Sequence, residues 1–252
     1  MVSIWTHLSN MGNEFYSPGD QRATQVNRLF ATIATRYDLI NDVQSFGLHR
    51  WWKRQLVRMA QVRPGESALD LCCGTGDIAF ALARQGAQVT GLDFSEPMLK
   101  VAQARSDKEK AAIGNPKFFR GDAQNTGFPD ASFDIVTVGY GLRNLASVEL
   151  GLGEMIRVLK PGGRVLILDF GKPDNALWRA IYFGYLRLCV PVFGLIFCGK
   201  ASAYSYILES LKHYPAQRGV EAIMRKSGLV NVRVANPLAG AMGINYGKKP
   251  TR

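Results

Sequence analysis

The segment from Ser67 to Phe94 constrains the fold of this chain more than any other. An apolar run ends at Asp70, and the turn that follows contains Gly74 and Gly76. Small and apolar residues then predict a helix, and a second apolar run ends at Asp93. Glycines in a strand-to-helix turn let a ligand approach the backbone, and an acid at the tip of the next strand can accept hydrogen bonds from a ribose diol. The segment therefore predicts a site for an adenosine-containing cofactor, and the alternative is an ordinary α/β turn capped by an acid.

The carboxylates beside this turn distinguish between two cofactors. Gly74, Gly76 and Ala79 fit the dinucleotide pattern G-x-G-x-x-G/A loosely. Asp70 and Asp77 flank the turn, and both would repel a pyrophosphate, whereas S-adenosylmethionine has no phosphate and carries two positive groups. The sequence therefore favours S-adenosylmethionine over NAD. The pattern D-x-x-x-G-x-G followed by a strand-end acid resembles motif I of the class I S-adenosylmethionine-dependent methyltransferases.

Short apolar strands alternate with helices along most of the chain. We expect strands at 68–71, 88–92, 117–120, 133–138, 164–169, 229–234 and 241–246, and helices at 77–85, 97–112, 148–159 and 218–226. Ser95 is a candidate N-cap, and the Lys-Pro-Gly-Gly sequence at 160–163 predicts a helix end. The alternation predicts an α/β fold with a doubly wound, mostly parallel sheet. Because ligands lie at the carboxyl ends of such strands, 70–77, Asp93, Asp122 and 139–144 should surround one crevice.

Three segments fall outside this alternation. Residues 1–20 are expected to form a flexible extension, with Met11 as a candidate alternative start. Residues 21–63 predict a helical cover, and residues 172–217 predict an aromatic-rich helical insertion after the fifth strand that caps the crevice. The alternative for the insertion is a set of helices that pack on a sheet face. We expect residues 21–252 to form one domain.

Charge and cysteine content limit the partners. The net charge of +11 indicates an anionic partner, either acidic lipid or nucleic acid, or else only a basic surface. The longest apolar run, 188–199, is too short to span a bilayer, and no secretory signal precedes the first helix. The four cysteines form no C-x-x-C pair and the three histidines are dispersed, so we expect a reducing, cytoplasmic compartment and no metal site. The sequence is compatible with both a monomer and a homodimer.

Four blocks of sequence together resemble the menaquinone and ubiquinone biosynthesis C-methyltransferases. They are Tyr-Asp-Leu-Ile-Asn-Asp with Ser-Phe-Gly-Leu-His-Arg-Trp-Trp-Lys in 37–53, the glycine turn in 69–77, Gly-Leu-Arg-Asn and Lys-Pro-Gly-Gly in 141–163, and Tyr-x-Tyr with Glu-Ser, Pro and Gln in 204–217. The first block and Gly-Leu-Arg-Asn are the selective ones, because the glycine turn and Lys-Pro-Gly-Gly occur in many methyltransferases. The resemblance implies a mostly parallel, seven-stranded sheet whose last strand is antiparallel.

The resemblance also implies site residues. Those expected to bind the cofactor are Tyr37, Asp70, Gly74, Thr75, Gly76, Asp93, Phe94, Asp122, Ala123 and Gly139. Asp93 would hold the ribose hydroxyls, and Asp122 with Ala123 would lie beside the adenine. The implied reaction is methylation of a ring carbon of a prenylated quinol, either demethylmenaquinol or a ubiquinol precursor. Its tail would lie in the insertion, and the basic surface would hold the protein on the inner face of an anionic membrane.

Arg143 and Asn144 are the expected catalytic residues. Arginine is a poor base, so we expect Arg143 to stabilise a phenolate electrostatically and Asn144 to orient it. The alternative is a structural pair that caps the next helix. A nucleic-acid methyltransferase is disfavoured, because Val138–Gly141 replaces the Asn/Asp-Pro-Pro-aromatic motif of the amino-methylating enzymes. Methylation of another small aromatic or lipid molecule, or a non-catalytic lipid-binding module, remains as a further alternative.

Overall fold

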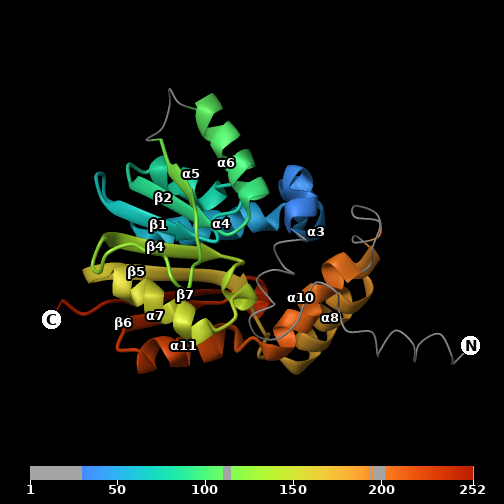
Figure 1. Ribbon diagram of the computed structural model, residues 1–252. Coiled ribbons are helices and arrows are strands. Elements are labelled where there is room, and N and C mark those ends of the chain that lie inside the picture. Colours follow the sequence, from blue (N-terminus) through green and yellow to red (C-terminus); the bar gives the residue numbers. More distant parts are fainter. Residues whose placement is uncertain (1–29, 110–114, 193–194, 196–201, 252) are drawn as a thin grey trace, which may run out of the picture.

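The computed structural model describes residues 30–109, 115–192, 195 and 202–251, and a seven-stranded sheet forms its centre (Figure 1). The strands are β1 (Ser67–Leu71), β2 (Gln88–Asp93), β3 (Lys117–Arg120), β4 (Phe133–Gly139), β5 (Leu159–Phe170), β6 (Val230–Ala235) and β7 (Met242–Lys248). Their order is β3-β2-β1-β4-β5-β7-β6, and β7 is antiparallel to both of its neighbours. This arrangement confirms the predicted fold class.

One set of helices connects successive strands of the sheet, and the other set either precedes the first strand or belongs to the insertion after the fifth. They are α3 (Tyr37–Ser45), α4 (Leu48–Ala60), α5 (Asp77–Ala83), α6 (Glu96–Glu109), α7 (Val148–Val158), α8 (Ala176–Leu188), α10 (Ser202–His213) and α11 (Ala216–Lys226), with the short 3-10 helices η1 (Ala34–Arg36), η2 (Leu142–Asn144) and η3 (Pro237–Gly240). The helical segment before β1 and the helical insertion after β5 are thus both present.

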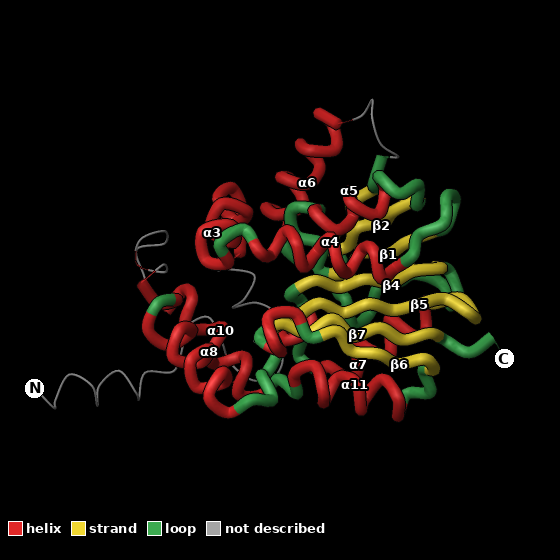
Figure 2. The backbone as a smooth tube through the Cα atoms, turned by 180° about the vertical axis from the view of Figure 1, so that it is seen from behind, coloured by secondary structure: helices red, strands yellow, loops and turns green. Residues whose placement is uncertain are grey.

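Alternate side chains of each strand pack into two separate cores. On one face, Leu69 and Val136 pack with the apolar sides of α7 and α11 (Figure 1). On the other, Ala68 and Ile135 pack with α4 and α5 (Figure 2). Because neighbouring residues of a strand point to opposite faces, strands covered by helices on both sides are apolar throughout, which is why the sequence predicted them well.

Two local predictions were wrong: the start of β5 and the role of Ser95. Helix α7 ends at Val158, as the Lys-Pro-Gly-Gly sequence predicted, but that sequence already belongs to β5. Gly162 donates to the Lys249 carbonyl at 3.0 Å, and Gly163 accepts from the Lys249 amide at 2.8 Å. Ser95 directly precedes α6, but its buried hydroxyl has no hydrogen-bond partner and therefore caps nothing. The carboxylate of Asp93 instead accepts the backbone N–H of Ser95 at 2.8 Å.

The site is built where the strand order reverses, between β1 and β4. The turns after these strands diverge there and leave a crevice at the carboxyl edge of the sheet. Helix α3 lies over this edge, and α8 and α10 lie together beside it in both views (Figures 1 and 2). The Tyr185 hydroxyl of α8 donates to the Gln44 carbonyl of α3 at 2.7 Å and joins the two covers. The predicted extension, 1–20, residues 21–29 of the predicted helical cover, and residues 193–194 and 196–201 of the insertion lie outside the described residues.

Candidate functional site

The two glycines of the β1–α5 turn have different surroundings. Gly74 has φ +54° and lines a cavity, and a Cβ there would meet only Met98 at an ordinary 3.4 Å. Gly76 has φ +88°, and a Cβ there would lie 2.9 Å from the rings of both Phe80 and Phe118. Gly74 therefore leaves space for a ligand, whereas Gly76 leaves space for aromatic packing behind the turn.

The cavity beside Gly74 contains most of the predicted cofactor residues. Tyr37, Gly74, Asp93, Phe94, Asp122, Ala123, Gly139 and Asn144 all line it. Three predicted residues, Asp70, Thr75 and Gly76, are not among its lining residues, and the first two line a smaller cavity beneath the turn. The structure thus brings seven of the ten predicted cofactor residues together around one cavity.

The charge of the first cavity has one sign. Its ionisable side chains, among the described residues that line it, are Asp93 and Asp122 together with two tyrosines and a cysteine, without lysine or arginine. Asp93 accepts the Gly74 backbone N–H at 2.8 Å, and Asp122 is exposed. Burial raises the pKa of Asp93, and hydrogen bonds from the backbone of Ser95 and Gly74 oppose that rise. A cavity with two carboxylates and no cation suits a positively charged ligand without phosphate.

Three buried polar atoms of residues that line the same cavity have no hydrogen-bond partner among the described residues. They are the Ser95 hydroxyl, the Tyr140 hydroxyl and the Asn144 side-chain oxygen. A buried polar group without a partner is costly, so these atoms are positioned to hydrogen-bond a ligand. The residues present therefore fit S-adenosylmethionine, which carries hydroxyl, amino and charged groups around an adenosine.

Asp70 and Asp77 were expected to repel phosphate, and that reasoning was wrong. Burial raises the pKa of Asp70 to about 7, and its side chain accepts the Thr137 hydroxyl at 2.7 Å inside the sheet. Burial also raises the pKa of Asp77, but ion pairs with Lys53 and Arg105, each 2.8 Å long, outweigh this and hold it well below its usual range. The acidity of the cavity comes from Asp93 and Asp122 instead.

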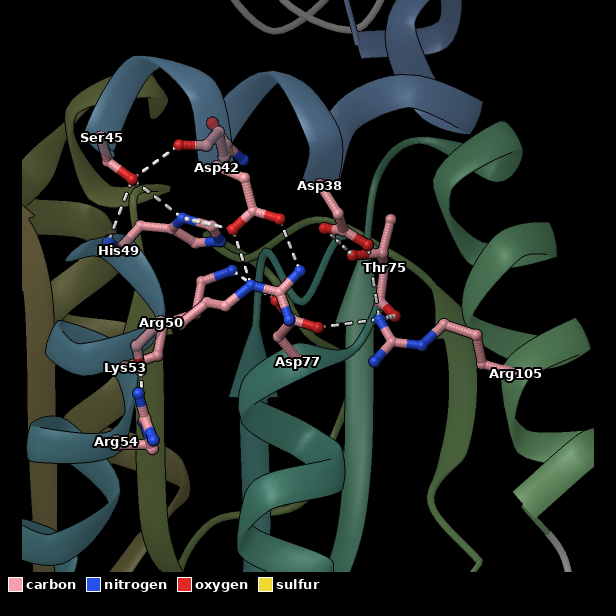
Figure 3. Close-up of polar contacts among 11 residues, drawn as sticks. Asp38, Asp42, Ser45, His49, Arg50, Lys53, Arg54, Thr75, Asp77 and Arg105 are labelled. Carbon is pink, nitrogen blue, oxygen red and sulfur yellow. Dashed lines mark hydrogen bonds and ion pairs between the residues drawn. The ribbon is translucent and has the colours of Figure 1, made fainter. Parts of the chain in front are cut away.

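Asp77 also belongs to a network that ties the helical cover to the turn (Figure 3). Lys53 of α4 and Arg105 of α6 meet at the Asp77 carboxylate. Arg105 also donates to the Thr75 carbonyl at 2.8 Å, and the Thr75 hydroxyl donates to Asp38 of α3 at 2.9 Å. The network fixes α3 and α4 above the crevice, so Thr75 contributes to the position of the cover.

A second, larger cavity adjoins the first and shares Phe30, Tyr37 and Tyr140 with it. Its walls are largely aromatic and aliphatic and come from α3, α4, α8 and the segment around η3. Burial raises the pKa of Tyr140 and of Tyr182, another lining residue, so both hydroxyls stay protonated and can donate hydrogen bonds. This cavity suits a large apolar ligand with a polar end near Tyr140.

Arg143 and Asn144 are neighbours in η2 but line different cavities. Asn144 lines the first, and Arg143 lines the second. The Arg143 guanidinium donates to the Asp169 carboxylate at 2.7 Å and to the Tyr140 carbonyl at 2.6 Å, and both members of the ion pair are buried. Its charge is therefore balanced by Asp169, which was not anticipated from the sequence.

Five uncharged polar side chains in the second cavity each have a buried atom without a hydrogen-bond partner. They are Asn41, Gln44 and His49 of the helical cover, and Tyr140 and Tyr182. The sequence analysis did not single out any of them as a site residue. The available signal was the density of polar and aromatic residues in 37–50, too high for a plain amphipathic helix.

Comparison with known proteins gives a consistent result. The model of the ubiE/COQ5 methyltransferase family matches residues 19–249. The chain is 42% identical over 241 residues to a demethylmenaquinone methyltransferase of Desulfitobacterium hafniense, with 92% of each chain covered. It is 38% identical over 236 residues to a ubiquinone/menaquinone biosynthesis C-methyltransferase of Azotobacter vinelandii, covering 92% of this chain and 93% of that one.

Solved structures show the same fold at lower identity. A SAM-dependent methyltransferase from Aquifex aeolicus has a TM-score of 0.58 at 17% identity, over 80% of this chain and 91% of that one. A Haemonchus contortus phosphoethanolamine N-methyltransferase 2, in complex with S-adenosyl-L-methionine, has a TM-score of 0.58 at 20% identity, over 79% of this chain and 53% of that one. Both likenesses concern the fold alone.

Proposed function

The chain belongs to the ubiE/COQ5 methyltransferase family, and on that premise we propose that it methylates a ring carbon of a prenylated quinol in respiratory quinone biosynthesis. It is an S-adenosylmethionine-dependent C-methyltransferase. One observation carries the proposal about the substrate: an acidic cavity and a large apolar cavity adjoin at Tyr37 and Tyr140. A methyl donor bound in the first cavity and a hydrophobic acceptor bound in the second would meet at this junction.

The first cavity would hold the cofactor, which supplies an electrophilic methyl group on a sulfonium when bound. We assign the ribose hydroxyls to Asp93 and the adenine to Asp122 and Ala123, with Phe94 beside it, since all four line this cavity. Asn144 would hydrogen-bond the same ligand through its unpartnered side-chain oxygen. Asp70, Thr75 and Gly76 would act through the shape and position of the turn.

The second cavity would hold the quinol. Its polar ring would lie at the Tyr140 end beside Arg143, and its isoprenoid tail would run between α3 and α8 under the 172–217 segment. Because Asp169 balances the Arg143 charge, Arg143 would orient the ring through its fixed position and would support developing negative charge only weakly. Candidate acceptors are demethylmenaquinol and a ubiquinol precursor.

We further propose peripheral contact with an acidic membrane on the cytoplasmic side. Phe46 is 80% exposed, and it lines the second cavity together with the exposed Leu48, Ile181 and Leu238. No helix within the described part of the chain has the length and apolar character needed to cross a bilayer. An apolar rim on a chain with a net charge of +11 would receive a lipid from an anionic surface. Absence of sedimentation with acidic liposomes at low salt would refute this.

Calorimetric titration tests the cofactor assignment. We expect binding of S-adenosylmethionine and none of NADH, with binding weakened at least tenfold by Asp93→Ala, because one charged hydrogen bond contributes about 1.5–3 kcal/mol. Asp130→Ala is the matched control, since it removes an exposed carboxylate at the opposite end of β4, outside the cavity linings. Methylation of short-tailed demethylmenaquinol and of a ubiquinol precursor then tests the substrate, and turnover of neither would overturn the quinol proposal.

A further inference from the structure

His49 is a buried histidine at the start of α4, and it joins the helical cover to the second cavity. Its side chain is 4% exposed, and its Nε2 has no hydrogen-bond partner. The residue lines the second cavity together with Arg143 and with Tyr140, which also lines the first cavity. The imidazole therefore offers one unpartnered ring nitrogen in the wall of the second cavity.

The hydrogen bonds of Ser45 determine which ring nitrogen carries the proton (Figure 3). The Ser45 hydroxyl donates its single proton to the Asn41 carbonyl at 2.6 Å. The same oxygen lies 3.0 Å from His49 Nδ1, so that contact can be a hydrogen bond only if Nδ1 is the donor. The Asp42 carboxylate, 3.6 Å from Nδ1, favours the same arrangement. Neutral His49 thus carries its proton on Nδ1 and presents a lone pair at Nε2.

Burial and nearby positive charges keep His49 neutral. Burial and the positive charges of Lys53 and Arg50 lower its pKa to about 4, against the opposing effects of Asp42 and Asp77. All four groups lie on α3, α4 and α5, which surround the ring. At neutral pH the Nε2 atom is therefore a hydrogen-bond acceptor.

We propose that His49 is a catalytic residue whose Nε2 accepts the proton of the substrate's ring hydroxyl during methyl transfer. This inference rests on the proposed function and names a base that Arg143, paired with Asp169, cannot supply. Nδ1–H and Ser45 fix the tautomer, much as a second group orients the base in other acid–base sites.

The bonds and protons of the methyl transfer follow from the chemistry of phenols. The ring carbon ortho to the hydroxyl forms a bond to the methyl carbon, the S–CH₃ bond breaks, and its electron pair stays on sulfur. The hydroxyl proton passes to Nε2 and leaves a dienone. The ring proton on the methylated carbon then leaves to water, and the oxygen recovers a proton from the imidazolium. One proton is released for each methyl transferred.

A weakly basic imidazole is adequate for this role. A free phenol, with a pKa of about 10, would not give its proton to such a base before reaction. As the ring carbon bonds to the methyl group, electron density leaves the oxygen, and its proton becomes strongly acidic. The transfer to Nε2 therefore accompanies bond formation, when the acceptor is needed.

The first test is an ¹⁵N NMR spectrum of the full chain with labelled histidines. The sequence has only three histidines, and His49→Gln and His213→Gln identify two of them. We expect a protonated Nδ1 and an unprotonated Nε2 for His49, and a shift of Nε2 on addition of 1-naphthol that naphthalene does not cause. A proton on Nε2, or equal effects of the two compounds, would overturn the proposal without reference to activity.

The second test is turnover of the quinol. We expect His49→Gln to lower kcat about 100-fold or more while affinity for S-adenosylmethionine stays unchanged, and a fall of less than about threefold would overturn the proposal. His213→Gln makes the same change at an exposed histidine and should leave kcat unaltered. If wild-type protein methylates no quinol, the proposed function fails instead, and the NMR result still decides the role of the imidazole nitrogen.

Discussion

Replacing Gly76 with alanine should destabilise this protein for a reason that the glycine pattern alone does not reveal. The backbone there has φ +88°, and a methyl group would lie 2.9 Å from the rings of Phe80 and Phe118. Gly65 has nearly the same φ, +87°, but a Cβ there would have nothing within 4 Å. The two alanine variants therefore share the backbone strain and differ in the steric contact.

The magnitude follows from these two parts. An L-residue in the left-handed region costs about 1–2 kcal/mol, which both variants should lose. Overpacking a tight core costs a further ~1–3 kcal/mol, and this second cost should apply only to Gly76→Ala. The rings of Phe80 and Phe118 already pack at 5.6 Å between centroids, so they have little room to separate. We expect a difference in the free energy of unfolding of about 1–3 kcal/mol between the variants.

Urea denaturation followed by circular dichroism measures both values on one scale. A total loss of this size is smaller than the usual stability of a domain, about 5–15 kcal/mol, so both variants should fold. If Gly76→Ala were no less stable than Gly65→Ala, the packing explanation for Gly76 would be wrong. The glycine would then be free to serve the ligand, as the sequence pattern first suggested.

Three further predictions concern buried charges. Asp169→Ala should lower the free energy of unfolding by about 3–5 kcal/mol, because it leaves the Arg143 guanidinium buried and unbalanced; urea denaturation checks this, and a loss below about 1 kcal/mol would contradict it. Asp70→Asn should stabilise the protein more at pH 8 than at pH 5. Burial raises the pKa of the Asp70 carboxyl from 3.8 to about 7, so the folded protein becomes less stable as the pH rises through this range and the carboxyl ionises. Equal effects of the substitution at both pH values in thermal melts would refute this. A hydrogen bond from Arg157 lowers the pKa of Glu154 from 4.5 to about 2, so its contribution is present above pH 4.5 and lost as the pH falls through 2; Glu154→Gln should flatten the acid limb of stability measured between these values.

The central strands β1 and β4 were predictable because they are buried on both faces. An apolar run between glycine, proline and aspartate boundaries identifies such a strand, and the observed bounds of β4, Phe133–Gly139, agree with the predicted 133–138 to within one residue. The exception is the start of β5, where Lys-Pro-Gly-Gly forms sheet-like bonds with Lys249. That partner is far along the sequence, so no local pattern reveals it.

The first cavity was predicted more successfully than its chemistry. Position at a strand end placed Asp93 and Asp122 correctly, because the carboxyl ends of parallel strands meet at one edge. Adjacency in sequence misassigned Asp77, whose first-turn position in α5 directs it to Lys53 and Arg105. Ion pairing between different helices determines whether a carboxylate faces a ligand, and single-sequence patterns do not contain that information.

The second cavity could be predicted only as a region. Its polar atoms on Asn41, Gln44 and His49 belong to helices that precede the sheet, and they become cavity walls because α8 packs against α3 through Tyr185. That contact joins residues 141 positions apart. Helical periodicity identifies which residues share a face, but it does not show which distant element covers that face.

The place of β7 in the sheet determines the order in which the fold can be completed. This strand lies between β5 and β6, yet it follows both of them along the chain. Until β7 arrives, β6 has no neighbour to pair with among the described strands, and the outer edge of β5 stays open. Insertion of an interior strand after its two neighbours requires contacts between distant residues, which form slowly. During synthesis, the half of the sheet that carries the cofactor turn can therefore assemble early, while the exposed edge of β5 must be kept from pairing with other chains until the last strand closes it.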